Sequence, residues 1–368
     1  MKSDKLTSYN YNIGLLKIFF SFVVVTCHYW LSTRGGESLT LSNFFEKSFN
    51  EIRSAAVPVF FIISFILTSK MIYYPNYNKS SKRFIRLFYP SVMWGLIYYA
   101  SYWIIDVFIG QFFFSAETVE KFKIPLTDLL WQTLFGSDRY LNPPLWYMYD
   151  LIIVMFLFLA IFKHYKKYSF EIISVLGILS LFTQYSGLNY KFISPLRYEM
   201  CYTIGRIVEM IPYAIIGLII GLKENNLFAI VEKARIFRVL AVFTIIFISF
   251  VLLALKRGYF SAEGFYYQGM KLIVKSTLIF LFVYRFVNIE RYIPILKGAI
   301  RFLAKYSLGI YCIHFAVGKY WNIFSDLIGK PELKNTILGC IIIYLVCLVL
   351  SYVISKLLPT KYARMLVE

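Results

Sequence analysis

The chain has 368 residues, of which 59% are hydrophobic, 20% aromatic and 16% charged, with a net charge of +19. Together with a mean hydropathy of +0.64, this composition excludes an ordinary soluble globular domain. Apolar segments of about 15 to 20 residues, rather than the alternating ten-residue pattern of outer-membrane barrels, predict an all-α, polytopic membrane helical bundle.

Ten transmembrane helices are predicted, with both termini in the cytoplasm. The predicted inner segments carry a clear excess of Lys and Arg over acids, whereas the outer loops are nearly balanced. Most of the positive charge is therefore a topology signal, although a basic inner face also suits an anionic cytosolic ligand or anionic lipid. The predicted spans are 13–31, 52–69, 87–105, 145–162, 171–186, 206–222, 239–255, 269–285, 301–318 and 336–355.

The first predicted span contains a lysine and a histidine in an otherwise nearly uncharged run. Lys17 and His28 are eleven residues apart, so helical geometry puts them on one face, about 16 Å apart along it. Ionisable groups inside a membrane helix often serve a function, and this pair is the first site hypothesis. Alternatively, Lys17 extends to the inner interface and His28 is an ordinary interfacial residue. No small-residue cleavage site follows, which indicates a retained anchor rather than a signal peptide.

A basic segment precedes the third predicted span. Lys70 to Pro90 contains five Lys or Arg residues and no acid. Within it, Arg83 and Arg86 are at i, i+3 spacing, so two guanidinium groups share one side of a helix and suit bidentate phosphate contacts. The alternative is a plain charge cluster that fixes topology.

The longest predicted outer loop, 106–144, leads into the fourth span through two prolines. Trp146 follows them and suits stacking on a sugar ring, although an interfacial aromatic belt has the same appearance. Asp150 lies about one turn inside that span. Both residues are candidates for contacts with the acceptor substrate.

Other charges fall in or near the sixth and eighth spans. Arg206 and Glu209 are at i, i+3 spacing and are expected to pair with each other. Lys271 and Lys275, one turn apart, are expected to face a water-filled cavity, where they would meet an anionic acceptor or Asp150. All four are candidate substrate-binding residues.

Two further helix faces carry recognisable spacing. Gly217 and Gly221 form a GxxxG step in the sixth span, which predicts close helix packing. In the ninth span, Ser307, Tyr311 and His314 fall on one face at i, i+4 and i+7. His314 is expected at a depth comparable with that of His28.

Other motifs that would indicate a disulfide, metal or nucleotide site are absent from the sequence. The five cysteines form no CxxC pair, so neither a disulfide framework nor a metal site is predicted. Cys27 is read as a packing residue rather than a nucleophile. The sequence has no nucleotide-binding fingerprint, hydrolase elbow or metal-ligand cluster, and no metal is expected.

Four segments, in the right order along most of the chain, together resemble the acyltransferase-3 family of bacterial membrane proteins. Phe65 is the one departure, at a position where the family usually has Gly. The matching segments are Lys17 and His28, for Arg or Lys, ten residues, then His; Val57 to Ser64, for Val-Pro-x-Phe-Phe-x-x-Ser; Arg83, Arg86 and Pro90, for Arg-x-x-Arg followed by Pro; and Ser307 to His314, for Ser-Leu-Gly-Ile-Tyr-x-x-His.

The resemblance implies a single integral-membrane acyltransferase domain over residues 1–368, with no fused extracytoplasmic domain, in the bacterial cytoplasmic membrane. Such enzymes pass an acyl group, usually acetyl, from cytosolic acyl-CoA to a hydroxyl of an extracytoplasmic cell-surface glycan. By resemblance, Lys17, Arg83 and Arg86 would contact CoA and His28 would be catalytic. Tyr311 and His314 are supporting candidates, as oxyanion stabilisers.

A protein of another class remains the alternative. A polytopic transporter or exporter of a glycan or lipid-linked sugar would line its passage with the same intramembrane charges and perform no covalent chemistry. No inverted internal repeat is evident in the sequence, which favours the enzyme. Release of free thiol from acyl-CoA would distinguish the two.

Overall fold

The computed structural model describes residues 10–29, 49, 51–74, 77–101, 103–104, 127, 145–186, 198–224, 270–286, 294–334, 336–358 and 360–367. Every regular element within these residues is helical, which agrees with the predicted all-α class. The helices are α1 (Tyr11–Tyr29), α3 (Ala56–Tyr73), α4 (Tyr77–Ser101), α7 (Trp146–His164), α8 (Ser169–Ser186), α10 (Tyr198–Glu224), α12 (Met270–Phe286), α14 (Lys297–Lys305), α15 (Ser307–Leu327), α16 (Ile337–Leu357) and α17 (Thr360–Leu366), with 3-10 turns at Lys166–Tyr168, Pro294–Leu296 and Pro331–Leu333.

Among the described residues, five helices are long and apolar enough to cross a membrane, and the bent pair α14–α15 would make a sixth. They are Tyr11–Tyr29, Glu51–Tyr73, Trp146–His164, Thr203–Lys223 and Ile337–Leu357. The protein is therefore a multi-pass membrane protein. The predicted span 239–255 lies outside the described residues.

The predicted ninth span, 301–318, falls on two helices with a bend between them. The chain bends by 57° between α14 and α15. Tyr306 leaves helical geometry at φ −95° and ψ 6°, and its N–H bonds three residues back to the Leu303 carbonyl at 3.2 Å. The N–H of Gly309, in the first turn of α15, is then satisfied by the Val367 carbonyl at 3.2 Å. A local 3-10 turn and a long-range cap together permit the break.

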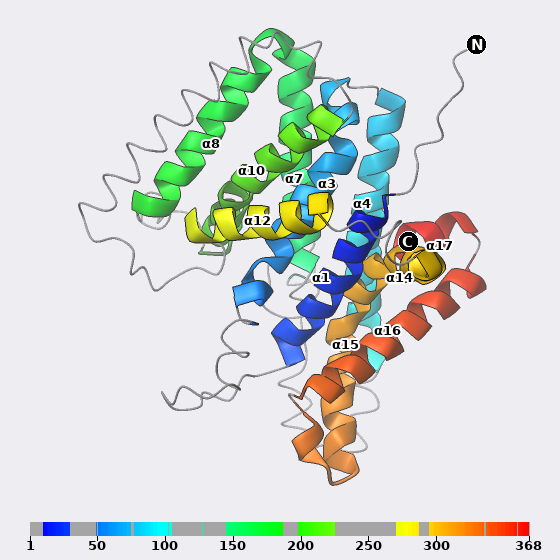
Figure 1. Ribbon diagram of the computed structural model, residues 1–368. Helices are drawn as coiled ribbons and strands as arrows, with labels where there is room; N and C mark the ends of the chain where they lie inside the picture. The colour runs from blue at the N-terminus through cyan, green and yellow to red at the C-terminus, as the bar shows by residue number, and fades with distance from the viewer. Residues whose placement is uncertain are drawn as a thin grey trace. The chain divides into compact units, whose positions relative to one another are not determined.

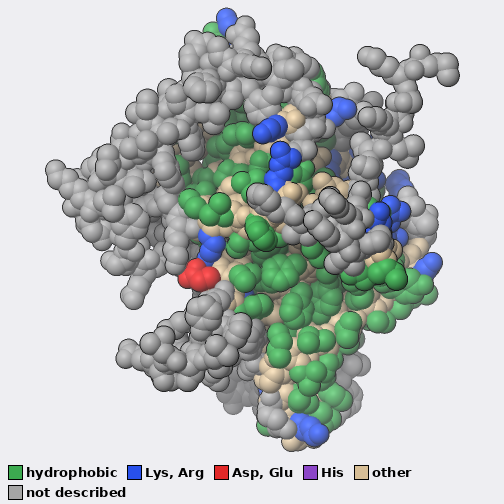
Figure 2. Space-filling model, in the orientation of Figure 1, with side chains coloured by type: hydrophobic (Ala, Val, Ile, Leu, Met, Phe, Trp, Pro, Cys, Tyr) green, Lys and Arg blue, Asp and Glu red, His purple; other side chains and the backbone are tan. Residues whose placement is uncertain are grey.

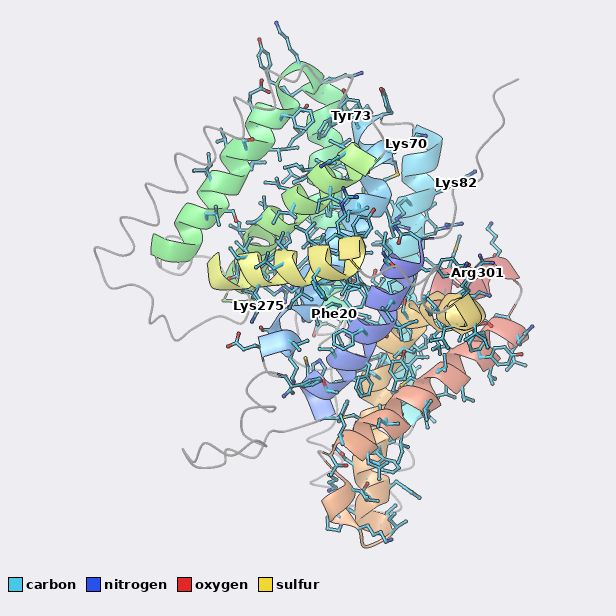
Figure 3. The ribbon with its side chains drawn as sticks, viewed as in Figure 1. Phe20, Lys70, Tyr73, Lys82, Lys275 and Arg301 are labelled. Atoms are coloured by element: carbon cyan, nitrogen blue, oxygen red, sulfur yellow. The ribbon has the colours of Figure 1, made fainter. Side chains whose placement is uncertain are left out.

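The described chain divides into two compact units, residues 1–56 with 275–368 and residues 57–274. In the first unit α1 packs against α14, α15 and α16, and α15 and α16 lie side by side as an antiparallel hairpin (Figure 1). Phe20, in the middle of α1, is fully buried (Figure 3). A Cβ atom at Gly309 would lie 2.9 Å from the Val367 side chain, so this glycine allows the C-terminal segment to approach α15.

In the second unit α7 packs against α4, α8 and α10, and α8 also packs against α10 (Figure 1). Lys70 near the end of α3 and Lys82 near the start of α4 are both exposed (Figure 3). The close packing predicted from the GxxxG step is confirmed. A Cβ atom at Gly217 would lie 2.8 Å from the Phe65 side chain, and one at Gly221 would lie 2.7 Å from the Ile66 carbonyl. Backbones of α3 and α10 therefore meet where only glycine fits.

The outward face of α16 in the first unit is apolar. Leu345, Val349 and Val353 are exposed there. Figure 2 shows hydrophobic side chains covering α15 and α16, with Lys and Arg side chains at the ends of this surface. This distribution is that of a helical hairpin in contact with lipid tails, with basic residues at the headgroups.

Candidate functional site

His28 and His314 come together in the first unit. His28 is exposed on the last turn of α1, and His314 is fully buried in α15. Their ring centroids are 5.3 Å apart, and the Phe315 ring is T-shaped to the His28 ring, with centroids 5.9 Å apart. Two histidines far apart in the sequence thus form one side-chain cluster, here named the histidine pair.

The tautomer of His314 follows from its own helix. Its Nδ1 lies 2.7 Å from the Tyr311 carbonyl and 3.3 Å from the Ile310 carbonyl. Carbonyls only accept hydrogen bonds, so Nδ1 carries the proton and Nε2 carries the lone pair. Nε2 is buried and has no hydrogen-bond partner in the described part of the chain. A buried acceptor without a hydrogen bond lowers the stability of the folded protein by about 1–3 kcal/mol. A hydrogen bond donated by a substrate hydroxyl or by the N–H of His28 would offset this loss.

A tyrosine and a glycine hold α1 against α15 beside the histidine pair. The Tyr29 hydroxyl donates to the Phe315 carbonyl at 2.7 Å. The Tyr29 ring lies directly on Gly318, where any Cβ atom would overlap it. Because Tyr29 follows His28 in the chain, this contact fixes the end of α1 at the level of His314.

The other candidates of the first unit are in the expected helices. Lys17 is half-buried in α1, which is unbroken as far as His28, so the two share the face that helical spacing predicted. Tyr311 is buried, with its ring centroid 6.0 Å from that of His314. Its main-chain carbonyl, rather than its hydroxyl, makes the contact that orients His314.

In the second unit, Arg83 and Arg86 both lie on α4, as predicted. Arg83 is half-buried, and its Nε is buried without a hydrogen-bond partner in the described residues, whereas Arg86 is exposed. The Arg83 guanidinium lies within electrostatic range of the Tyr147 hydroxyl. That hydroxyl is 3.2 Å from Ser64 Oγ on α3. Sequence reasoning placed Tyr147 among the interfacial aromatics that follow the Pro-Pro entry and did not connect it with Ser64 or Arg83.

A buried ion pair links α7 and α10. Arg206 Nε and Nη2 donate to the two carboxylate oxygens of Asp150 at 3.1 and 3.2 Å. The guanidinium also lies over the Trp146 ring, 4.8 Å from its centroid. From the sequence, Lys271 and Lys275 were expected to meet an anionic acceptor or Asp150, and Arg206 and Glu209 were expected to pair with each other. The structure pairs Asp150 with Arg206, because α7 packs directly on α10.

Lys275 has a different partner from the one expected. In the first unit its ammonium donates to Glu51 Oε2 at 2.6 Å and to Ser54 Oγ at 2.8 Å. Lys271 lies in α12, but its side chain is outside the described residues. Glu209 is buried on α10, one turn from Arg206.

The sequence-predicted residues are therefore divided between the two units. The first holds Lys17 with the histidine pair and Tyr311, and the second holds the Arg83 and Arg86 motif. Among the described residues, no group of three His, Cys, Asp or Glu side chains is arranged to hold a metal ion.

Several helices long and apolar enough to span a membrane define a multi-pass membrane protein. The family model described as an acyltransferase domain, acyltransferase 3, matches residues 10–356. The chain belongs to the acyltransferase 3 family. Neither the comparison with curated proteins nor that with solved structures finds a match.

Proposed function

We propose that this acyltransferase moves an acyl group, with acetyl as the expected one, from cytosolic acyl-CoA to a hydroxyl of an extracytoplasmic cell-surface glycan. The observation that carries the proposal is the histidine pair in a chain of an acyltransferase family, since a neutral imidazole in such a position is a suitable general base. The protein is then an O-acyltransferase of the bacterial cytoplasmic membrane.

His28 is the proposed base. It takes the proton of the acceptor hydroxyl as that oxygen attacks the thioester carbon. The C–S bond then breaks, and the CoA thiolate leaves and recovers the proton from His28. An acyl-His intermediate would divide the same transfer into two steps. His314, with its Nε2 lone pair, is proposed to support His28 or the acceptor hydroxyl, and Tyr311 holds His314 in that tautomer.

Lys17, Arg83 and Arg86 are the proposed contacts of the anionic CoA. The half-buried Arg83, with an unsatisfied Nε, suits a phosphate oxygen. Lys17 would act as a point charge rather than a bidentate fork. Trp146, Asp150, Arg206, Glu209, Lys271 and Lys275 remain proposed contacts of the glycan.

The proposed topology has ten spans and two cytoplasmic termini, supported by the distribution of Lys and Arg. It predicts that a cysteine placed at Ser80 is shielded from impermeant thiol reagents in intact cells, whereas one at Ser115 reacts. The reverse labelling pattern would contradict the topology.

The function is tested with purified protein in detergent, acetyl-CoA labelled in the acetyl group, and a panel of cell-surface glycans. The expected result is release of free CoA thiol in step with labelled glycan, and His28→Ala serves as the inactive control. A transporter would release no thiol but would move labelled glycan across the membrane of proteoliposomes. That outcome would overturn the enzyme assignment.

A further inference from the structure

Two basic side chains of α14 converge on the first residue of α1. Lys297 Nζ lies 5.7 Å from the centroid of the Tyr11 ring, and the Arg301 guanidinium carbon lies 5.9 Å from it. Arg301 Nη2 also donates to the Tyr11 hydroxyl at 3.2 Å. α14 packs directly against α1 in the first unit, and Arg301 is labelled in Figure 3. These three residues are here named the Tyr11 cluster.

The helices around the Tyr11 cluster add positive charge and no acid. Asn12 Nδ2 donates to the Tyr284 carbonyl at 2.9 Å, which joins the start of α1 to the end of α12. The exposed Arg285 follows Tyr284 directly. The segments α1, α12 and α14 contain no Asp or Glu. Cations on these helices create a positive potential at this end of the unit, and such a potential attracts anions.

The two cations of the Tyr11 cluster repel each other. Lys297 and Arg301 are at i, i+4 spacing on α14, where like charges destabilise a helix. The Tyr11 ring offsets part of that repulsion through cation–π attraction. An anion bound to both cations would replace the repulsion by attraction. A phosphate suits the pair, since a guanidinium presents a planar fork to its oxygens and an ammonium presents a point charge. Within the described chain Arg301 is exposed and Lys297 half-buried, so a ligand can approach from solvent.

The Tyr11 cluster lies at the opposite end of α1 from the histidine pair. α1 is unbroken, and the 17 residues from Tyr11 to His28 correspond to about 26 Å of helix. In the proposed topology Tyr11 is at the cytoplasmic end, where acyl-CoA arrives. Acyl-CoA carries its phosphates at one end and its thioester at the end of a long, flexible arm. A phosphate held at the Tyr11 cluster would leave this arm to extend along α1 toward His28.

We propose that Tyr11, Lys297 and Arg301 bind a phosphate group of the acyl-CoA donor. The inference rests on the proposed function and adds a donor contact in the unit that holds the histidine pair. Lys297 and Arg301 supply the charge, and the Tyr11 hydroxyl holds the Arg301 fork. Binding is non-covalent and leaves the transfer at His28 unchanged. An anionic lipid headgroup carries the same phosphate chemistry, so the test separates the two sources.

The test compares acetyl-CoA with acetyl-pantetheine, which keeps the thioester and lacks every phosphate. In the thiol-release assay, Lys297→Gln and Arg301→Gln should each raise the KM for acetyl-CoA by about two- to tenfold, because contacts of exposed charges are modest. Their kcat should change little. Both variants should match the wild type with acetyl-pantetheine. If acetyl-pantetheine is too slow a donor to assay, equilibrium binding of CoA and of pantetheine gives the same comparison.

Lys356→Gln is the matched control. Lys356 is exposed near the end of α16 in the same unit, and its Nζ lies over the Tyr352 ring, 5.6 Å from the centroid. The control therefore removes a similar cation from a similar aromatic partner at another place. It should keep the wild-type KM for acetyl-CoA.

The source of the phosphate is separated in nanodiscs of phosphatidylcholine, with and without phosphatidylglycerol. The increase in KM should be the same in both. An increase that needs phosphatidylglycerol assigns the Tyr11 cluster to a lipid headgroup and overturns the inference.

Two further results would contradict it. With an active wild type, an unchanged KM for acetyl-CoA in both Lys297→Gln and Arg301→Gln overturns this inference alone. An equal loss with acetyl-pantetheine also overturns it, because the role of the cluster is then structural. A wild type that releases no thiol overturns the proposed function and this inference with it.

Discussion

Two polar clusters of this protein, one in each unit, differ in their chemistry. In the second unit, Asp150 and Arg206 form a bidentate ion pair covered by Trp146. In the first unit, His314 has one ring nitrogen bonded to its own helix and the other buried without a partner in the described chain. Buried opposite charges that pair can serve packing alone, whereas a neutral imidazole with an available lone pair can accept a proton. The comparison favours the histidine pair as the reaction centre.

The largest effect is expected at His28. His28→Ala should lose about 10² to 10⁴ in kcat, because one positioned proton acceptor contributes about this much. The pH–rate profile of the wild type should rise as the base loses its proton, and the mutant should lack that limb. Equilibrium binding of acetyl-CoA is the control and should change little. Normal kinetics in His28→Ala would move the base to His314 or Asp150.

The ion pair should behave as a structural element. Asp150→Ala leaves the Arg206 guanidinium without this carboxylate, so the free energy of unfolding should fall by about 3 to 5 kcal/mol. Replacing both residues by apolar ones, as in Asp150→Leu with Arg206→Met, should restore much of that loss. Thermal denaturation in detergent measures both. If the double variant is stable but does not bind the glycan, the pair also contacts the acceptor.

A smaller effect is expected at Arg83. Hydrogen bonds to charged groups contribute about 1.5 to 3 kcal/mol, so Arg83→Ala should raise the KM for acyl-CoA by about tenfold to a hundredfold, with a lesser change in kcat. Phosphate contacts are made equally in the ground and transition states, which is why KM carries the effect. Lys82→Ala, one residue earlier, is the matched control. If Arg83→Ala binds acyl-CoA as tightly as the wild type, the Arg83 and Arg86 motif only fixes the membrane topology.

The smallest effect is expected at His314. If it supports the reaction through one neutral hydrogen bond, worth about 0.5 to 1.5 kcal/mol, His314→Ala should lower kcat by about two- to tenfold. His314→Gln, which offers a carbonyl oxygen as acceptor, should lose less. A loss as large as that of His28→Ala would reverse the roles of the two histidines.

Local spacing predicted much of the site. The shared face of Lys17 and His28, and the face of Ser307, Tyr311 and His314, follow from helical periodicity alone. The close approach at Gly217 also followed from local sequence, because small residues at that spacing have one common use in membranes.

Contacts between distant segments could not be predicted in the same way. The partner of Asp150 depends on which helix packs on α7, and spacing along the chain does not show that this helix is α10. Next to the bend at Tyr306, the N–H of Gly309 bonds the carbonyl of Val367, which lies 58 residues further along the chain.

The neutrality of the Asp150–Arg206 pair bears on how the protein responds to an energised membrane. One elementary charge that crosses the full membrane potential gains or loses about 2.3 kcal/mol per 100 mV. Two opposite charges that move together cross the same field with no net electrical work. A movement of α7 and α10 together, with this pair intact, would therefore gain no dependence on the membrane potential from these two residues. Its rate would not differ on their account between respiring and de-energised cells.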